Sequence, residues 1–496
     1  MKVTQEKWKK EKGITLIALV VTIVVLLILA GITINMLFSN EGIFKTTGDA
    51  ANTWNEATKN EQESLTNIAE QIGNLVNEQI GEGTTNPEEP EDQKPIPADG
   101  SFNEEKGVNT PDLAGGKLTP VKWVKNEMVT TTPEDPEWYS YNTTDKKWAN
   151  AITADGSMWV WIPRYAYQIS TLYHQSSETG GKINIKFMKG TTDEAADGTT
   201  TWQNSSGQGN WNIHPGFEYS STAPGLWVAK FEASQSDAGA NTADYQSYTG
   251  GTSGVIKIQP GVNSWRNISV FDVYTKCLNY ETSLNSHMMK NSEWGAVVYL
   301  AQSSYGKNAE VWINPNSNYL TGHAGTGKNV EVTLSTSEYN TTNGVQASTT
   351  GNVYGIYDMS GGAFEQVAAY VNNGSSYITD IGGQLATGES YTKDVYDGMA
   401  DQFSDYERSI SHYGDAVYEI SERMENTGGI KSWFGFPISY PVVSAPFIVR
   451  GDVVYSKFTN GMFFFTASMG LARKIWDFQA RMHMAFDQFL FHYNIW

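Results

Sequence analysis

The stretch GNVYGIYDMSGGAFEQVAAY, Gly351–Tyr370, combines closely spaced glycines with aromatic residues. The same composition is found through most of this chain. From about Val108 to the C-terminus, short apolar and aromatic runs alternate with clusters of Gly, Asn, Ser and Thr. Runs of this length bounded by turn residues are typical of buried or half-buried strands. We therefore expect an α+β domain with long irregular connections over residues 108–496.

Five further segments indicate individual elements on either side of this stretch. Apolar residues recur at helical spacing in FDVYTKCLNY (271–280) and SEWGAVVYLAQSSYG (292–306), which predicts two helices. Strands are predicted for SMWVWIPRYAYQI (157–169), GLWVAKFEAS (225–234) and PFIVRGDVVY (446–455).

Three blocks resemble the formylglycine-generating, sulfatase-modifying family. Gly351–Tyr370 resembles the family's GLYDMxGNVWEW signature, and Asn291–Gly306 lies where the family has its EAEWEYAAR helix. Phe447–Asp452 resembles the RVxRGGSW strand, and the blocks follow the family's order. The resemblance implies a C-type-lectin-like fold for residues 108–496.

The residue inventory argues against catalysis. The family's oxidase uses two late cysteines to bind copper, whereas this chain has only Cys277, which precedes the signature block. The loop Gly322–Asn329 resembles a phosphate-binding loop, but it lacks Ser or Thr after its lysine and precedes VEVTLSTSEYN (330–340), which alternates like a strand. The histidines form no metal-ligand pair, and His323 is expected in a solvated turn. We expect no enzymatic activity, catalytic residue, metal site or cofactor.

The C-terminal segment RGDVVYSKFTNGMFFFTASMGLARKIWDFQ (450–479) resembles the target proteins of diversity-generating retroelements, which use this fold without cysteines to bind ligands. Arg450-Gly451, Gly461–Phe465 and Gly470–Ala472 keep that frame, while Asp477 and Gln479 depart from it. The resemblance implies ligand-binding side chains between the fixed points: Tyr455, Phe458, Thr466, Ser468, Met469, Arg473, Lys474 and Trp476. Alternatively, Met469 and Trp476 belong to the core.

The N-terminal region predicts a membrane helix. Gly13–Asn40 has no charged residue, and Ile14–Leu37 would span about 36 Å as a helix, enough to cross a bilayer. The leader before Gly13 contains five lysines and two glutamates, which places the N-terminus in the cytoplasm. A plain signal anchor would have these same properties.

The sequence KGITL, Lys12–Leu16, resembles the class III signal of type IV prepilins and pseudopilins. The resemblance implies that a prepilin peptidase cleaves after Gly13, that Ile14 becomes N-methylated, and that the helix stays in membrane lipid. Ala18 stands where the family usually has a glutamate that pairs with a neighbouring subunit.

Together these features predict a single-pass protein of the cell membrane whose C-terminal domain is extracellular and binds a protein or glycan ligand. The alternative is a structural minor pilin or pseudopilin of a type IV pilus or type II secretion system, with other pilin subunits as partners. The net charge of −20 argues against nucleic acid as a partner. The predicted parts are a leader (1–13), a transmembrane helix (14–38), a stalk helix (39–81), an acidic Pro/Gly linker (82–107) and the lectin-like domain (108–496).

Overall fold

The computed structural model describes most of the chain from Ala98 onward. The described residues are 98–173, 179–219, 221–240, 254–266, 268–328, 330–398, 413–420, 422–423, 430–434, 437–438, 441–451, 454, 461–470, 478–479 and 482–485. They belong to one compact unit, Gln93–Trp496. The predicted leader, transmembrane helix and stalk helix lie outside the described residues. Among the residues that are described, no helix is both long and apolar enough to cross a membrane.

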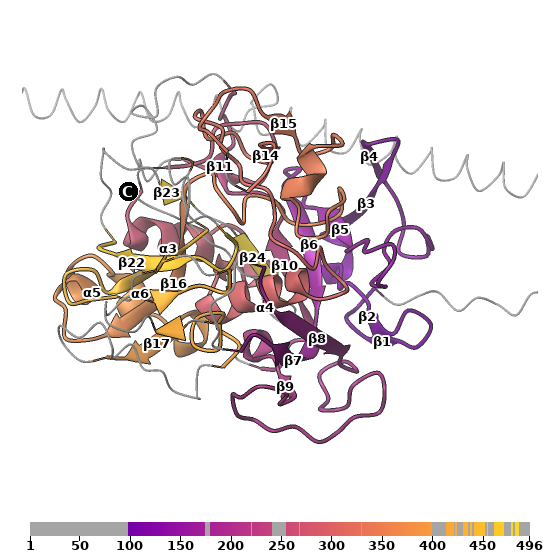
Figure 1. The fold of residues 1–496 in the computed structure, drawn as a ribbon. Helices are drawn as coiled ribbons and strands as arrows, with labels where there is room; N and C mark the ends of the chain where they lie inside the picture. The colour runs from indigo at the N-terminus through magenta and orange to yellow at the C-terminus, as the bar shows by residue number, and fades with distance from the viewer. Residues whose placement is uncertain are drawn as a thin grey trace, which may run out of the picture. The chain divides into compact units, whose positions relative to one another are not determined.

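The described chain has a mixed α+β architecture that consists mostly of sheet, as predicted (Figure 1). Its largest sheet has seven antiparallel strands in the order β13-β24-β10-β6-β5-β3-β4. In chain order these are β3 (Thr119–Val124), β4 (Glu127–Thr130), β5 (Asn150–Ile152), β6 (Met158–Pro163), β10 (Gly225–Ala229), β13 (His287–Met288) and β24 (Met482–Ala485).

A second sheet, of five strands, contains the end of the stretch Gly351–Tyr370. Its path is β17-β16-β21-β22, and β23 pairs with β16. β16 lies parallel to β17 and β23 but antiparallel to β21. The strands are β16 (Phe364–Asn372), β17 (Asp394–Asp397), β21 (Phe447–Arg450), β22 (Phe465–Ser468) and β23 (Phe478–Gln479).

Smaller elements complete the described chain. The order β8-β7-β9 forms a three-stranded sheet from β7 (Tyr165–Thr171), β8 (Lys182–Phe187) and β9 (Asn212–Ile213). The remaining strands are β1 (Phe102–Asn103), β2 (Val108–Asn109), β11 (Ser234–Gln235), β12 (Ile256–Lys257), β14 (His323–Ala324), β15 (Ser337–Glu338), β18 (Glu422–Arg423), β19 (Ile430–Lys431) and β20 (Pro437–Ile438). The 3-10 helices are η1 (Ala114–Gly116), η2 (Pro215–Phe217), η3 (Thr282–Leu284), η4 (Gly344–Ala347) and η5 (Ser390–Thr392).

The described α-helices are α3 (Val270–Leu278), α4 (Asn291–Gln302), α5 (Tyr377–Asp380) and α6 (Gln384–Thr387). In the two longer ones, α3 and α4, a side chain at the helix start accepts a hydrogen bond from a backbone N–H group there. The Ser269 hydroxyl accepts a hydrogen bond from the Asp272 N–H (3.1 Å) at the start of α3, and Glu293 accepts one from the Lys290 N–H (2.7 Å) at the start of α4. Every residue of α4 is buried, and the helix contacts β8 and β16. α4 is therefore a central core helix.

The core is rich in tryptophan. Trp161 on β6 and Trp227 on β10 face each other with ring centroids 5.5 Å apart. The Trp294 indole on α4 donates a hydrogen bond to the Met462 carbonyl (2.8 Å), which satisfies its polar atom. Eight tryptophans are almost completely buried: Trp138, Trp148, Trp159, Trp161, Trp227, Trp265, Trp294 and Trp433.

Lys230, directly after β10, is buried in the same interior. Its ammonium donates hydrogen bonds to Asn150 Oδ1 (2.9 Å) and to the carbonyls of Val353 (2.7 Å) and Gly355 (2.8 Å). Burial lowers the pKa of this ammonium well below its usual value. Lys230 therefore ties β10 to β5 and to the start of the stretch Gly351–Tyr370.

Most of the element predictions are confirmed, and three need correction. The predicted helices correspond to α3 and α4, and the predicted strands 225–234 and 446–455 contain β10 and β21. The single strand predicted over 157–169 is instead two strands of different sheets, β6 and the first part of β7. The strand predicted over residues 330–340 is wrong except at Ser337–Glu338. The packed domain also begins earlier than residue 108, because β1 pairs with β2 and Leu113 N–H donates to the Ala98 carbonyl (3.0 Å).

Candidate functional site

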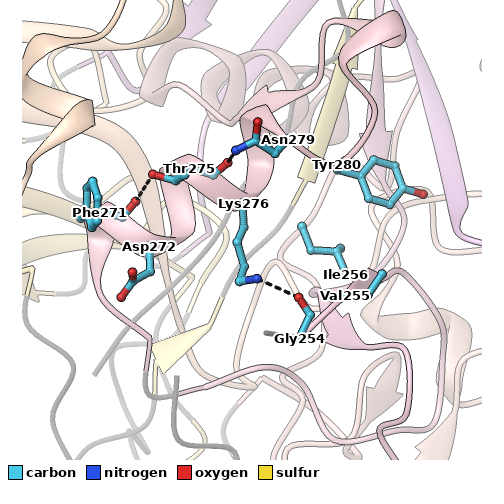
Figure 2. Close-up of a pocket in the computed structure, with 9 residues that line it drawn as sticks. All are labelled: Gly254, Val255, Ile256, Phe271, Asp272, Thr275, Lys276, Asn279 and Tyr280. Carbon is cyan, nitrogen blue, oxygen red and sulfur yellow. Dashed lines mark hydrogen bonds between the residues drawn. The ribbon is translucent and has the colours of Figure 1, made fainter. Parts of the chain in front are cut away.

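Helix α3 bears a pocket on each of two sides. The first, the lysine pocket, has a volume of about 360 Å³ (Figure 2). It is lined by Gly254, Val255, Ile256, Phe271, Asp272, Thr275, Lys276, Asn279 and Tyr280. The second, the tyrosine pocket, has a volume of about 380 Å³. It is lined by Tyr219, Tyr274, Leu278, Gln384, Thr387, Gly388, Glu389, Tyr391 and Thr392.

The lysine pocket combines an ammonium group with an apolar rim. Lys276 crosses the pocket and donates a hydrogen bond to the Gly254 carbonyl (2.8 Å), as Figure 2 shows. Its ammonium lies 5.2 Å from the centroid of the Trp265 ring. Burial lowers the pKa of Lys276, although the nearby Asp272 carboxylate opposes this shift. Phe271 and Val255 are 38% and 63% exposed, so an incoming ligand meets apolar surface first.

The tyrosine pocket is built from aromatic rings of distant segments. The Tyr219 and Tyr391 ring centroids are 4.5 Å apart, and Tyr219 stacks on His287 at 4.6 Å. The Tyr274 hydroxyl is hydrogen bonded to the Thr392 hydroxyl. Burial raises the pKa of Tyr274 to about 12, and the Glu389 carboxylate acts in the same direction. The Tyr274 hydroxyl therefore remains neutral at physiological pH.

The loop that forms one wall of the tyrosine pocket is held in place by Lys393. Its ammonium donates hydrogen bonds to the carbonyls of Leu385 (2.8 Å), Ala386 (2.8 Å) and Gly388 (2.7 Å). Gly388 contacts the Tyr274 hydroxyl so closely that a Cβ atom at this position would overlap it. The wall is thus fixed before any ligand arrives.

A hydrogen bond joins the rims of the two pockets. The Thr275 hydroxyl, in the lysine pocket, lies 2.9 Å from Gln384 Oε1, in the tyrosine pocket, and 2.9 Å from the Phe271 carbonyl, so these two acceptors share its proton. Helices α3 and α6 pack against each other at this point. The two pockets therefore belong to one continuous surface, which we call the α3 surface.

Three of the sequence-predicted ligand residues lie in the described chain. Thr466 and Met469 are half-buried, at and after β22. Ser468 is fully buried, and its hydroxyl accepts hydrogen bonds from Gln366 Nε2 (3.1 Å) and the Gly470 N–H (3.1 Å). The others, like the processing residues Gly13 and Ile14, lie outside the described residues: Tyr455, Phe458, Arg473, Lys474 and Trp476.

The described end of the predicted ligand segment touches the start of α3. The Val270 N–H donates a hydrogen bond to the Gly470 carbonyl (3.2 Å), and α3 lies beside the yellow C-terminal strands in Figure 1. None of the residues that line the two pockets was predicted from the sequence as a ligand residue. The polar Thr275, Lys276 and Asn279 recur at helical spacing on the outer side of α3, which is a signal that could have found them.

Two other reactive side chains of the described chain, Cys277 and His323, do not line the pockets of the α3 surface. The single cysteine, Cys277, is buried with no disulfide partner, and burial raises the pKa of its thiol. His323 is not in a solvated turn as predicted, because it is 9% exposed on β14 and hydrogen bonded to the Thr336 hydroxyl (2.8 Å). Within the described ranges, no group of three or more His, Cys, Asp or Glu side chains has a metal-binding arrangement.

The α3 surface offers binding chemistry of several kinds: tyrosine rings, hydroxyl and amide groups, an ammonium and two carboxylates. Pockets of roughly 300–1,000 Å³ with a few placed polar groups are typical of sites for small ligands. Comparison of the chain with protein-family models and with curated proteins gives no significant match.

Proposed function

We propose that this chain is a surface-displayed, non-catalytic ligand-binding protein, anchored in the cell membrane by a pilin-like N-terminus. On this proposal the extracellular α+β domain has a C-type-lectin-like fold and binds a protein or a glycan. The observation that carries the proposal is the α3 surface, where two pockets meet at the hydrogen bond between Thr275 and Gln384.

The composition of the α3 surface supports recognition of a polar ligand with apolar faces. Aromatic rings supply rigid contact area, and they are available in both pockets as Phe271 and Tyr391. Amide and hydroxyl groups from Asn279, Gln384 and Thr387 surround them and can fix a ligand's orientation. Sugars and the side chains of a protein partner both present this mixture.

The anchoring part of the proposal rests on the sequence. The basic leader, the cleavage junction Gly13-Ile14 and the apolar segment that follows resemble a processed prepilin. A prepilin peptidase would process the chain, membrane lipid would hold the helix, and the linker would carry the binding domain away from the membrane. The structural minor pilin remains the second candidate, because the same junction would admit the chain to a filament with other pilin subunits.

The binding proposal can be tested with the full chain, solubilised in a neutral maltoside detergent and labelled with a fluorophore. We expect it to bind a discrete set of immobilised glycans or a saturable partner on intact cells. Phe271→Ser should weaken this binding at least about tenfold, corresponding to ~1.4 kcal/mol. Met128→Ser is the matched control, since Met128 is 40% exposed and lies on β4, at the opposite edge of the seven-stranded sheet from β13.

Two results would contradict the proposal. One is an absence of binding above background on every surface tested. The other is an equal effect of Phe271→Ser and Met128→Ser, which would show that general surface hydrophobicity, rather than the α3 surface, governs the interaction. Purification of the chain within an extracellular filament would instead favour the structural pilin.

A further inference from the structure

We propose that the tyrosine pocket binds a small organic cation of the quaternary ammonium class, held against the faces of its tyrosine rings. This inference deepens the proposed function, because it assigns a ligand class to one of the two pockets of the α3 surface. It depends on the rings, the charge and the rigidity of the pocket.

The rings are the first argument. Tyr219, Tyr274 and Tyr391 all line the same pocket of about 380 Å³. Aromatic faces carry negative potential and attract cations, and cages of several aromatic rings are suited to alkylated ammonium groups, whose methyl groups also gain apolar contact. Tyr219 and Tyr391 are half-buried, so each ring keeps part of its surface open to an incoming ligand.

Charge is the second argument. Among the described residues that line the pocket, Glu389 is the charged side chain, and it is exposed at the rim. Burial raises the pKa of Tyr219, and the nearby carboxylates of Glu293 and Glu389 raise it further. Burial raises the pKa of Glu293 to about 8, so the negative potential in the pocket comes from the Glu389 carboxylate, and it favours a cation over a neutral or anionic ligand.

The ammonium groups near the pocket are engaged elsewhere. Lys393 donates to three carbonyls of the loop behind the pocket wall. Lys290 donates to the Glu218 carbonyl (2.7 Å) and lies 3.5 Å from Glu293 Oε1. The ammonium groups of Lys393 and Lys290 thus face backbone oxygens and a carboxylate rather than the pocket.

Rigidity is the third argument. Tyr219 is stacked on His287, Tyr274 is hydrogen bonded to Thr392, and the wall around Gly388 is fixed by Lys393. A pocket that is already in its binding arrangement loses little conformational entropy when a ligand enters. The tyrosine pocket therefore has the arrangement that a weakly hydrated cation requires.

The lysine pocket provides an internal contrast. Lys276 already places an ammonium there, so a second cation would be repelled. We therefore expect the two pockets to select ligand groups of different charge.

The test is a calorimetric titration of the full chain, in a maltoside detergent, with choline and with its neutral carbon isostere, in which a tert-butyl group replaces the trimethylammonium. The two compounds have the same shape, so a difference between them reports the charge. We expect saturable binding of choline and at least about tenfold weaker binding of the isostere. Equal affinities, or no saturable binding of choline, would overturn the proposal.

Substitutions locate the site. Tyr391→Phe keeps the ring and should change choline affinity less than about threefold, whereas Tyr391→Leu should lower it at least about tenfold. Glu389→Gln, at an exposed position, should weaken binding without affecting the fold. Met128→Ser, on β4 and outside the α3 surface, should leave the affinity unchanged. An unchanged affinity in both Tyr391→Leu and Glu389→Gln would refute the assignment.

A further arm identifies the source of the cation. Retention of the chain on immobilised phosphocholine, with elution by choline, would assign a phosphocholine headgroup. Passage through that column together with choline binding in solution would assign the free solute. If choline does not bind but Phe271→Ser still weakens attachment to cells or glycans, this inference is wrong and the proposed function stands. If choline binds but the chain attaches to neither cells nor glycans, the proposed function is wrong and the cation site stands.

Discussion

The hydroxyl of Thr275 on α3 donates a 2.9 Å hydrogen bond to Gln384 Oε1 on α6, across the boundary between the two pockets. This bond fixes the relative position of two helices that each supply residues to ligand pockets. One side-chain contact therefore couples the shapes of both pockets.

Replacing Thr275 by valine should loosen this coupling. The side chain keeps its volume but loses the bond, so we expect a loss of about 0.5–1.5 kcal/mol in the free energy of unfolding and weaker ligand binding. Denaturant unfolding and the binding assays above measure both effects. Thr379→Val is the matched control, because the described contacts of the exposed Thr379 hydroxyl are local, to the Ser376 carbonyl (3.1 Å) and Asp380 Oδ1 (3.5 Å). Equal effects of the two substitutions would contradict the coupling.

A second prediction concerns the pH dependence of stability. Burial raises the pKa of Glu419 to about 7, where it accepts hydrogen bonds from the hydroxyls of Tyr167 (2.6 Å) and Tyr299 (3.0 Å). Because the folded state holds this proton more tightly than the unfolded state, the contribution of Glu419 to stability falls as pH rises from about 4.5 to 7. The change is on the order of 3 kcal/mol.

The effect can be isolated with Glu419→Gln, which does not titrate. We expect the free energy of unfolding of the parent, minus that of the variant, to decrease between pH 5 and pH 7 in denaturant titrations and then to level off. Glu127→Gln, at an exposed position of β4, is the control and should give a flat difference. A difference for Glu419→Gln that is constant or rises over this range would contradict the pKa shift.

The start of the folded domain gives a third prediction. A soluble chain that begins at Gln93 should be more stable than one that begins at Val108, which lacks β1 and the Ser101 carbonyl that accepts from Thr110 N–H (2.8 Å). We expect the shorter chain to lose roughly 1–3 kcal/mol, since it loses several backbone hydrogen bonds. The melting temperatures of the two chains measure this difference. Equal melting temperatures would place the start of the folded domain at Val108.

The fourth prediction concerns processing. We expect a mature N-terminus at Ile14, carrying a methyl group, because Gly13 lies between the basic leader and the apolar segment. Mass spectrometry of the membrane-extracted protein measures this directly. Gly13→Val should block cleavage, whereas Ala18→Ser, inside the apolar segment, should not. An intact Met1 on the parent protein would show that the segment is a plain signal anchor.

The elements that the sequence predicted correctly are those whose apolar residues form a recognisable run or spacing within one segment. The run Met158–Pro163 is buried at every position, so its continuous apolar composition was sufficient to predict a strand. Helix α4 was also found from its apolar spacing. The strand predicted over residues 330–340 failed because Thr333 exchanges hydrogen bonds with Pro315 and Ser317 of a neighbouring loop instead of a long ladder, which leaves Leu334 63% exposed.

The tyrosine pocket could not be predicted in the same way. Its rings come from Tyr219, Tyr274 and Tyr391, which are far apart in the chain and approach one another only through the packing of α3, α6 and η5. The spacing of residues within one segment cannot predict a contact between residues of distant segments. Tyr391 in particular follows a glycine and two polar residues, a context that indicates a turn rather than a binding group.

The position of β24 has a consequence for biogenesis. This strand, Met482–Ala485, lies between the edge strand β13 and β10, so β13 is joined to the rest of the seven-stranded sheet by residues more than 350 positions after β3. Contacts of such long sequence separation form slowly, and unpaired strand edges are prone to aggregate. On the proposed topology, the exported chain would hold two open strand edges until residues 482–485 leave the translocation channel. Its folding would therefore be completed only after export, and premature termination near the C-terminus would yield a protein that aggregates rather than a slightly shorter functional one.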